Sequence, residues 1–118
     1  PSAQHAALAA FLPETIAILE ARRREFQARR DFLMPALRKL GFVIEVEPEG
    51  SFYIYADCSK IADDSFALSR RILQEAHVAI TPGKDFGLNH PERYIRIAYT
   101  NPIARLQEAV ERIARVLL

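Results

Sequence analysis

The stretch Val78–Thr100, VAITPGKDFGLNHPERYIRIAYT, is the part of the chain around which the other elements can be placed. It predicts a short apolar strand over residues 78–80 and a longer strand over residues 94–99. Pro82-Gly83 marks a break between them, because proline and glycine favour turns. We therefore expect two strands of one small sheet, separated by a loop.

Alternation gives the second strand one apolar face and one face that carries a charge. Successive side chains of a strand point to opposite faces, so Arg96 shares a face with Tyr94 and Ala98. An unpaired buried guanidinium is unfavourable, so Arg96 requires a carboxylate, a phosphate or water. The presence of Arg96 in this strand therefore indicates either a solvated face or a face that binds an anion. The opposite face consists of Ile95, Ile97 and Tyr99.

The composition is that of an ordinary globular domain of 118 residues, 50% apolar and 26% charged. A formal net charge of +1 gives no bulk field that would attract nucleic acid or an anionic membrane. Cys58 is the only cysteine, which excludes an internal disulfide and leads us to expect a reducing, cytoplasmic location. No apolar run reaches the roughly 18 residues of a membrane span.

The start of the chain is apolar and predicts a helix over residues 2–12, with Ser2 as its N-cap and Pro13 as its interruption. The chain begins at Pro1 rather than at methionine, and we expect it to be a fragment. A set of apolar side chains in this helix should then pack on a part of the protein outside the chain. This set is Ala6, Ala7, Leu8, Phe11 and Leu12.

A long helix is predicted over residues 14–40, and Gly41 should end it as the C′ residue. Its centre is rich in arginine, which we expect to be solvated and paired locally, as in Glu20–Arg24 and Glu25–Arg29. One stripe at spacings of three and four is apolar at both ends. It consists of Ile16, Leu19, Arg23, Phe26, Arg30, Leu33, Leu37 and Leu40.

A hairpin is predicted next, from residues 42–47 and 51–56 joined by a turn at Pro48-Glu49-Gly50. Alternation should direct Phe42, Ile44 and Val46 inward from its first strand. The second strand should carry Phe52, Ile54 and Ala56 on one face.

Two more helices complete the prediction. The first covers residues 65–77, is capped by Asp63 or Asp64, and buries Leu68, Ile72, Leu73 and Ala76. The second starts at Asn101-Pro102, with Asn101 as N-cap. The order of elements predicts an α+β fold, an α/β sandwich. Its small mixed or antiparallel sheet of three to four strands is packed by helices and preceded by a long linking helix.

Several kinds of catalytic site lack their motifs here. Gly83-Lys84 is followed by Asp85, so the phosphate loop GxxxxGK[ST] is missing. The histidines do not have metal-ligand spacing, and Cys58 has no nucleophile motif around it. We therefore predict no catalytic residue and no metal ligand in this chain.

Two motifs in order carry a family resemblance. PGxxFG (Pro82–Gly87) precedes the IRI strand, and Gly50-Ser51-Phe52-Tyr53 matches a G-x-F-Y element upstream. Together they resemble the C-terminal small domain of fold-type I aminotransferases, enzymes of the aspartate aminotransferase superfamily that depend on pyridoxal 5′-phosphate (PLP). The resemblance implies that Arg96 binds the α-carboxylate of the substrate and that Phe52 lies at the edge of the substrate pocket.

The resemblance also implies a division of the enzyme. Residues 1–13 would be the exit segment from a large cofactor domain, and residues 14–118 the small domain. PLP would be bound by that large domain, since Lys39, Lys60 and Lys84 have no acidic partner for a pyridinium nitrogen. The expected partners are amino-acid and 2-oxo-acid substrates, the large domain and a second copy in a homodimer. The chain alone should be inactive.

Two questions stay open from the sequence. Decarboxylases and lyases share this domain, so transamination follows from the frequency of aminotransferases in the superfamily. The alternative is a non-catalytic α+β ligand-binding or regulatory module, in which Arg96 holds a free ligand or none. The reading frame upstream of Pro1 would distinguish the two.

Overall fold

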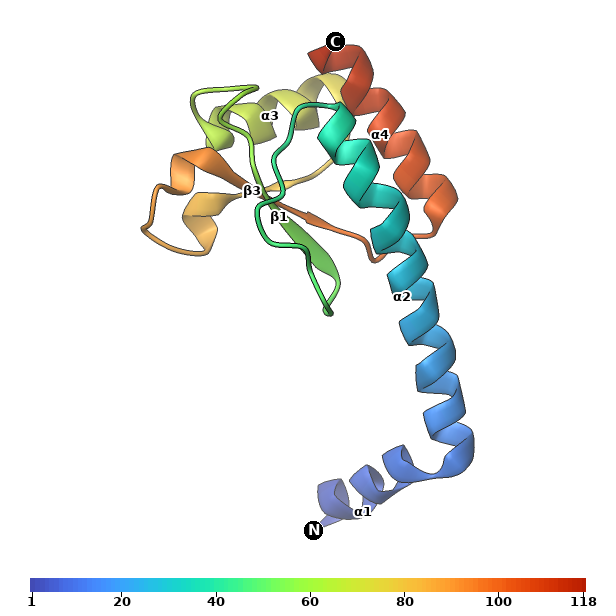
Figure 1. Cartoon of the computed structure of the whole chain (residues 1–118). Coiled ribbons are helices and arrows are strands. Elements are labelled where there is room, and N and C mark those ends of the chain that lie inside the picture. The colour runs from blue at the N-terminus through green and yellow to red at the C-terminus, as the bar shows by residue number, and fades with distance from the viewer.

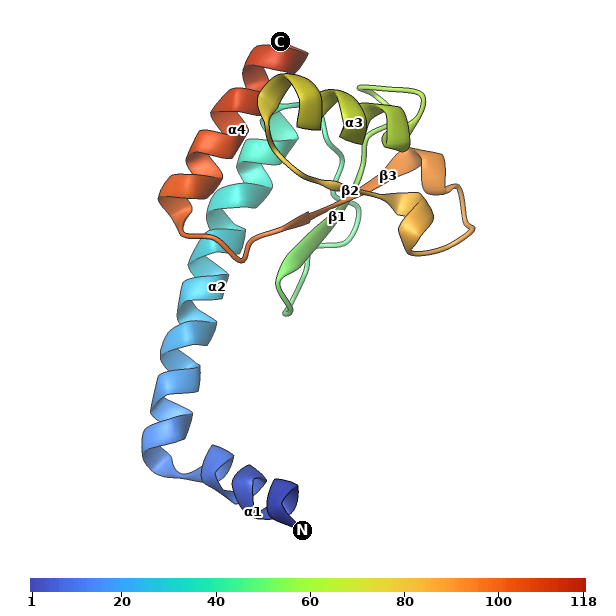
Figure 2. The ribbon, with the colours of Figure 1, turned by 180° about the vertical axis from the view of Figure 1, so that it is seen from behind.

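A small sheet with helices on one of its faces forms the body of the molecule, and a long helix projects from this body (Figure 1). The computed structural model describes residues 1–118. We call residues 26–118 the body and residues 1–25 the arm. The arm contains no buried residue and extends away from the sheet in both views (Figures 1 and 2).

The sheet contains β1 (Tyr53–Asp57), β2 (Thr81–Pro82) and β3 (Tyr94–Ala98), in the order β1-β3-β2. Both pairs are antiparallel, and Arg96 in the central strand is in register with Tyr55 on one side and Thr81 on the other. The predicted α+β fold with three strands is confirmed.

The predicted strand over residues 78–80 is wrong by a few positions. Pairing with β3 is confined to Thr81–Pro82, and proline has no N–H with which to extend the ladder. The preceding Val78 and Ile80 are half-buried and pack against the core. Contacts with the helical layer, rather than strand pairing, therefore hold this segment.

The predicted hairpin is also wrong. Residues 42–47 form no strand, and only Val43 bridges to Asp57 at the outer edge of β1. Phe42 and Ile44 are buried as expected, whereas Val46 is 79% exposed. After Val43 the chain leaves the edge of β1, so alternation no longer decides which side chains are buried.

Three helices form the layer on the inner face of the sheet: α3 (Ser65–Ala76), α4 (Ile103–Leu117) and the C-terminal half of α2 (Pro13–Lys39). Asp64 caps α3 as predicted, and its carboxylate accepts a hydrogen bond from the Phe66 N–H at 3.2 Å. Leu73 is 53% exposed, against the prediction, because it lies beside the core stripe of α3 rather than in it. The helical layer buries the sheet residues Ile54, Ala56, Ile95 and Ile97.

Helix α4 lies alongside the C-terminal half of α2 (Figure 2). It begins at Ile103, and Pro102 rather than Asn101 occupies the N-cap position. Glu108 and Arg112 form an ion pair on this helix. No helix in the molecule is long and apolar enough to cross a membrane.

The arm and the first part of the body are linked by α2 (Pro13–Lys39), which follows α1 (Ser2–Leu8) and a short 3-10 helix, η1 (Ala9–Phe11). Ser2 makes no capping hydrogen bond, and Pro13 is the first residue of α2. Gly41 has a φ of 102° and ends the helix as predicted.

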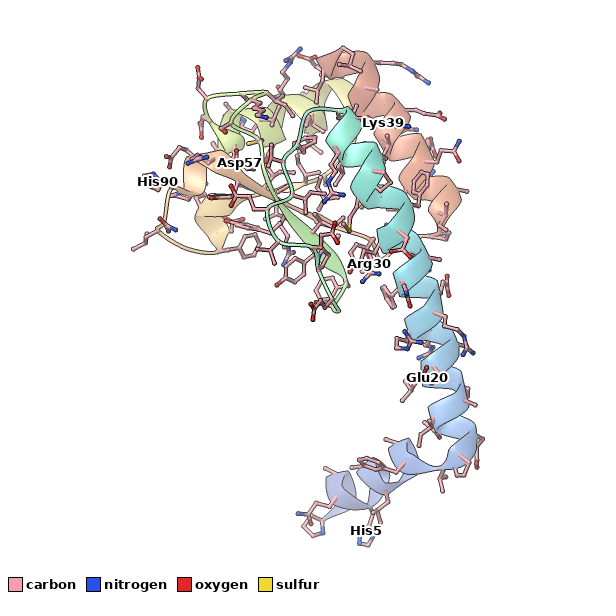
Figure 3. The ribbon with its side chains drawn as sticks, in the orientation of Figure 1. His5, Glu20, Arg30, Lys39, Asp57 and His90 are labelled. Atoms are coloured by element: carbon pink, nitrogen blue, oxygen red, sulfur yellow. The ribbon has the colours of Figure 1, made fainter.

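Only one end of the predicted apolar stripe of α2 is buried. Leu33 and Leu37 lie in the core, while Ile16 and Leu19 are exposed in the arm. The expected Glu25–Arg29 pair forms, and Glu20 pairs with Arg23 instead of Arg24. Figure 3 shows His5 and Glu20 on the arm, far from the sheet.

Candidate functional site

Arg96 lies in the middle of the sheet, on the face that the helices leave open. Its neighbours along β3, Ile95 and Ile97, are buried against the helical layer, so the period of two turns Arg96 to the other face. The register of the sheet places Tyr55 of β1 beside it on this open face. The predicted alternation of β3 is confirmed.

The guanidinium of Arg96 is surrounded by aromatic rings. Its Cζ lies 4.5 Å from the ring centre of Phe86, 5.5 Å from that of Tyr53 and 6.0 Å from that of Phe52. A cation over aromatic faces gains electrostatic attraction without being neutralised. The structure therefore brings together Arg96 and Phe52, the two residues singled out from the sequence.

Arg96 has no acidic partner. It forms no ion pair, and its Nε is buried without a hydrogen-bond partner. Buried donors in proteins are nearly always satisfied, so an unsatisfied guanidinium donor requires an explanation. The Nη atoms at the end of the guanidinium are the donors that a bound anion would engage.

A cavity of about 580 Å³ opens beside Arg96. Its wall is largely aromatic, with Tyr55, Phe86 and Tyr94 among the lining residues, and Glu45 is the only other charged residue there. Tyr55 and Tyr94 stack with their ring centres 5.0 Å apart. Burial and the neighbouring Tyr94 raise the pKa of Tyr55, so its hydroxyl is neutral at physiological pH.

The PGxxFG loop has a steric reason for its first glycine. A Cβ on Gly83 would lie 2.5 Å from the carbonyl oxygen of Pro91 and 2.9 Å from both the hydroxyl of Tyr55 and the carbonyl oxygen of Tyr94. Glycine lets the loop approach the sheet this closely, and three residues later Phe86 lies over Arg96. Gly87, the second glycine of the motif, has no atom within 4 Å of such a Cβ.

Sequence reasoning missed an ion pair at the end of β1. Arg93 donates to Asp57 at 2.7 Å, and Asp57 also accepts from the Ser59 N–H at 2.7 Å. Burial of Asp57 acts to raise its pKa, but the hydrogen bonds from Ser59 and Arg93 outweigh burial and lower it. Asp57 follows one predicted strand and Arg93 precedes another, so only the antiparallel register could have revealed the pair.

The chain offers no built site for PLP. Lys39 and Lys60 are exposed, and the Nζ of the exposed Lys84 lies 3.3 Å from the ring centre of Phe66 instead of near an acid. No group of three or more His, Cys, Asp or Glu side chains could hold a metal ion. Cys58 lies in the core, where burial raises the pKa of its thiol to about 11.

Comparison with known proteins places the chain in one family. The family described as aminotransferase class I and II matches residues 1–113. The valine–pyruvate aminotransferase of Mycobacterium tuberculosis is 34% identical over 93% of this chain and 28% of its own length. The LL-diaminopimelate aminotransferase of Moorella thermoacetica is 38% identical over 97% of this chain and 28% of its own length.

Solved structures agree. An aminotransferase from Mycobacterium tuberculosis superposes with a TM-score of 0.87 at 34% identity, over 95% of this chain and 29% of its own. An aromatic aminotransferase from Pyrococcus horikoshii gives a TM-score of 0.86 at 34% identity, over 95% of this chain and 30% of its own. The chain thus spans less than a third of these relatives. It belongs to the class I and II aminotransferase family, which confirms the resemblance seen in its motifs.

Proposed function

We propose that this chain is the C-terminal small domain of a PLP-dependent amino-acid aminotransferase, in which Arg96 binds the α-carboxylate of the substrate. The observation that supports this role is the guanidinium itself. Arg96 faces an aromatic cavity, has no ion pair, and keeps a buried Nε without an acceptor. A carboxylate in the cavity would accept hydrogen bonds from the Nη atoms of Arg96.

The shape of the ligand follows from the shape of the donor. A planar guanidinium can donate two parallel hydrogen bonds to the two oxygens of a carboxylate, which fixes the orientation of the ligand as well as its position. An amino acid and its 2-oxo acid carry the same carboxylate, so one arginine serves both substrates of a transamination. Phe52, whose ring lies near Arg96, would border the same ligand.

The cofactor belongs elsewhere in this proposal. Because the lysines of this chain are exposed and have no acidic partner, the residues present do not fit a PLP site. The remaining two-thirds or more of the enzyme would bind PLP, as the aminotransferase family implies. This chain alone would then be inactive.

Substitution of Arg96 in the full-length enzyme tests the proposal. Arg96→Lys keeps the charge but loses the two-pronged geometry, so kcat/KM should fall by about one and a half to four decades for both amino-acid and 2-oxo-acid substrates. PLP affinity and melting temperature should change little. Formation of a new amino acid from an added 2-oxo acid is the readout. It separates transamination, which passes the amino group on, from decarboxylases, which release CO2, and from lyases, which release ammonia.

Arg115→Lys is the matched control, because Arg115 is exposed on α4 and forms no ion pair. Its kcat/KM should stay within twofold of the wild type. If Arg96→Lys instead leaves kcat/KM intact and lowers the melting temperature, Arg96 supports the fold and the proposed role is wrong.

A further inference from the structure

Tyr99 connects the long helix to both parts of the candidate site. It follows β3 directly, three residues after Arg96, and its side chain is 1% exposed. Its ring packs on Phe26 of α2, with the ring centres 6.2 Å apart. Its carbonyl oxygen accepts a hydrogen bond from Nη1 of the buried Arg29, also on α2, at 3.4 Å. Tyr99 therefore joins the strand of Arg96 to the middle of α2.

The hydroxyl of Tyr99 reaches the turn that precedes Phe52. It donates to the carbonyl oxygens of Gly50 and Ser51, at 3.3 and 3.2 Å. The backbone N–H of Tyr99 donates to the carbonyl oxygen of Phe52 at 2.7 Å. One residue thus holds three consecutive carbonyl groups of the G-x-F-Y element.

This turn has a backbone that needs support. Ser51 has a φ of 66°, in the left-handed region that side-chain-bearing residues adopt at a cost. Its second anchor comes from α2, where Nη1 of Arg30 donates to the carbonyl oxygen of Pro48 at 2.9 Å. Arg30 lies on the side of α2 that faces the sheet (Figure 3).

The hydroxyl of Tyr99 keeps its proton and can therefore act as a hydrogen-bond donor. Burial raises the pKa of Tyr99, although the positive charge of Arg30 opposes this shift. The side chain is therefore protonated across the physiological range and can donate to the turn. A phenylalanine would fill the same space in the core without this hydrogen bond, so the hydroxyl can be tested separately from packing.

We propose that Tyr99 is a positioning residue for the substrate site: its hydroxyl holds the Gly50–Ser51 turn in its strained conformation and thereby fixes Phe52 beside Arg96. The inference rests on the proposed function of Arg96. It adds that the ring of Phe52 and the guanidinium are held in one geometry by a residue that touches no substrate. Because Tyr99 packs on Phe26 and accepts a hydrogen bond from Arg29, the positions of Phe52 and Arg96 depend on the position of α2.

The test uses Tyr99→Phe in the full-length enzyme. Loss of one hydrogen bond between neutral groups should raise KM for amino acids about fivefold, with kcat within twofold of the wild type. Adding Ser51→Gly to Tyr99→Phe should return KM toward the wild-type value, because glycine adopts a positive φ without strain. Thr100→Val, which removes the exposed hydroxyl of the next residue, is the control and should be silent.

The outcomes separate the two proposals. A lower melting temperature with unchanged KM would show that Tyr99 acts in packing alone and overturn the inference. A raised KM that Ser51→Gly does not reduce would also overturn it, because the effect would not pass through the turn. If Arg96→Lys is silent, the proposed function fails and this inference with it. If Arg96→Lys is impaired and Tyr99→Phe is silent, only the inference fails.

A second variant protects the test against a folding defect. Arg30→Gln removes the other anchor of the same turn and leaves the core side chain of Tyr99 in place. It should raise KM in the same direction, and Ser51→Gly should reduce this effect too. An unchanged KM for Arg30→Gln, together with an insoluble Tyr99→Phe, would overturn the inference.

Discussion

The two ends of α2 carry similar apolar residues in opposite surroundings. Leu37, in the body, is 1% exposed, whereas Leu19, in the arm, is 48% exposed. Both belong to the same stripe at helical spacing, so the helix alone does not explain the difference. The body supplies α4 and the sheet as partners for one end, and nothing in the chain covers the other.

The comparison teaches that an amphipathic pattern shows a need for a partner without identifying the partner. Phe11 is 77% exposed, and Leu8, Leu12, Ile16 and Ile18 are exposed beside it. Apolar side chains exposed in such number on one segment usually mark an interface. We propose that the arm packs against the part of the enzyme that lies outside this chain, with residues 1–13 as the segment that joins the two domains.

The largest effect is expected on the free energy of unfolding, in a matched pair of leucine truncations. Leu37→Ala should lower the free energy of unfolding of the chain by about 2–5 kcal/mol, because it leaves a cavity in the core. Leu19→Ala should change it by less than about 0.5 kcal/mol, because the side chain is already exposed. Urea denaturation of both variants measures the difference.

The same two variants also test whether the arm packs against the rest of the enzyme. In the full-length enzyme, Leu19→Ala should become clearly more destabilising than in the isolated chain, whereas the cost of Leu37→Ala should stay similar. Equal effects of Leu19→Ala in the two settings would contradict the proposed packing of the arm.

A smaller effect is expected where the body meets the candidate site. Gly83→Ala would place a methyl group against two backbone carbonyl oxygens that cannot move aside easily, those of Pro91 and Tyr94. The expected loss is about 1–3 kcal/mol of stability, typical of overpacking. Gly87→Ala, four residues away and in open space, should be nearly neutral. Thermal unfolding measures the stability of the two variants. Equal melting temperatures would contradict the close approach of Gly83 to the two carbonyl oxygens.

The smallest effect concerns pH and the ion pair between the buried Asp57 and the half-exposed Arg93. The pKa of Asp57 is lowered in the folded state, so its contribution to stability is present at neutral pH and is lost as the pH falls below about 4. The effect should be modest, because Arg93 is half-exposed and screened by water.

Urea denaturation at pH 7 and pH 3 measures this contribution. Asp57→Asn should be less stable than the wild type at pH 7 and should lose less stability on acidification. Asp63→Asn, at an exposed position, should retain the wild-type pH dependence. If Asp57→Asn kept the wild-type dependence of stability on pH, the predicted contribution of the Asp57–Arg93 pair would be wrong.

Local sequence patterns predicted most of the regular elements and the face of Arg96. Spacing of three and four identified α2, α3 and α4, and the period of two placed Arg96 opposite Ile95 and Ile97. The hairpin failed for a physical reason: alternation in residues 42–47 requires a neighbouring strand along its whole length, and the structure provides one bridge, at Val43. The alternation within one segment does not specify which other segment it pairs with in a sheet.

By itself, the sequence determined the helices, the central strand and the position of its one charge, because these depend on periodicities within a single segment. Tertiary structure alone decided which leucines of α2 are buried, how Asp57 meets Arg93, and how Tyr99 reaches the Ser51 turn. These contacts join residues far apart in the chain, and their free energy depends on the distance between groups that no local pattern specifies. The aromatic surroundings of Arg96 likewise come from Tyr53 of β1 and from the loop at Phe86, which only the folded sheet brings to Arg96 in β3.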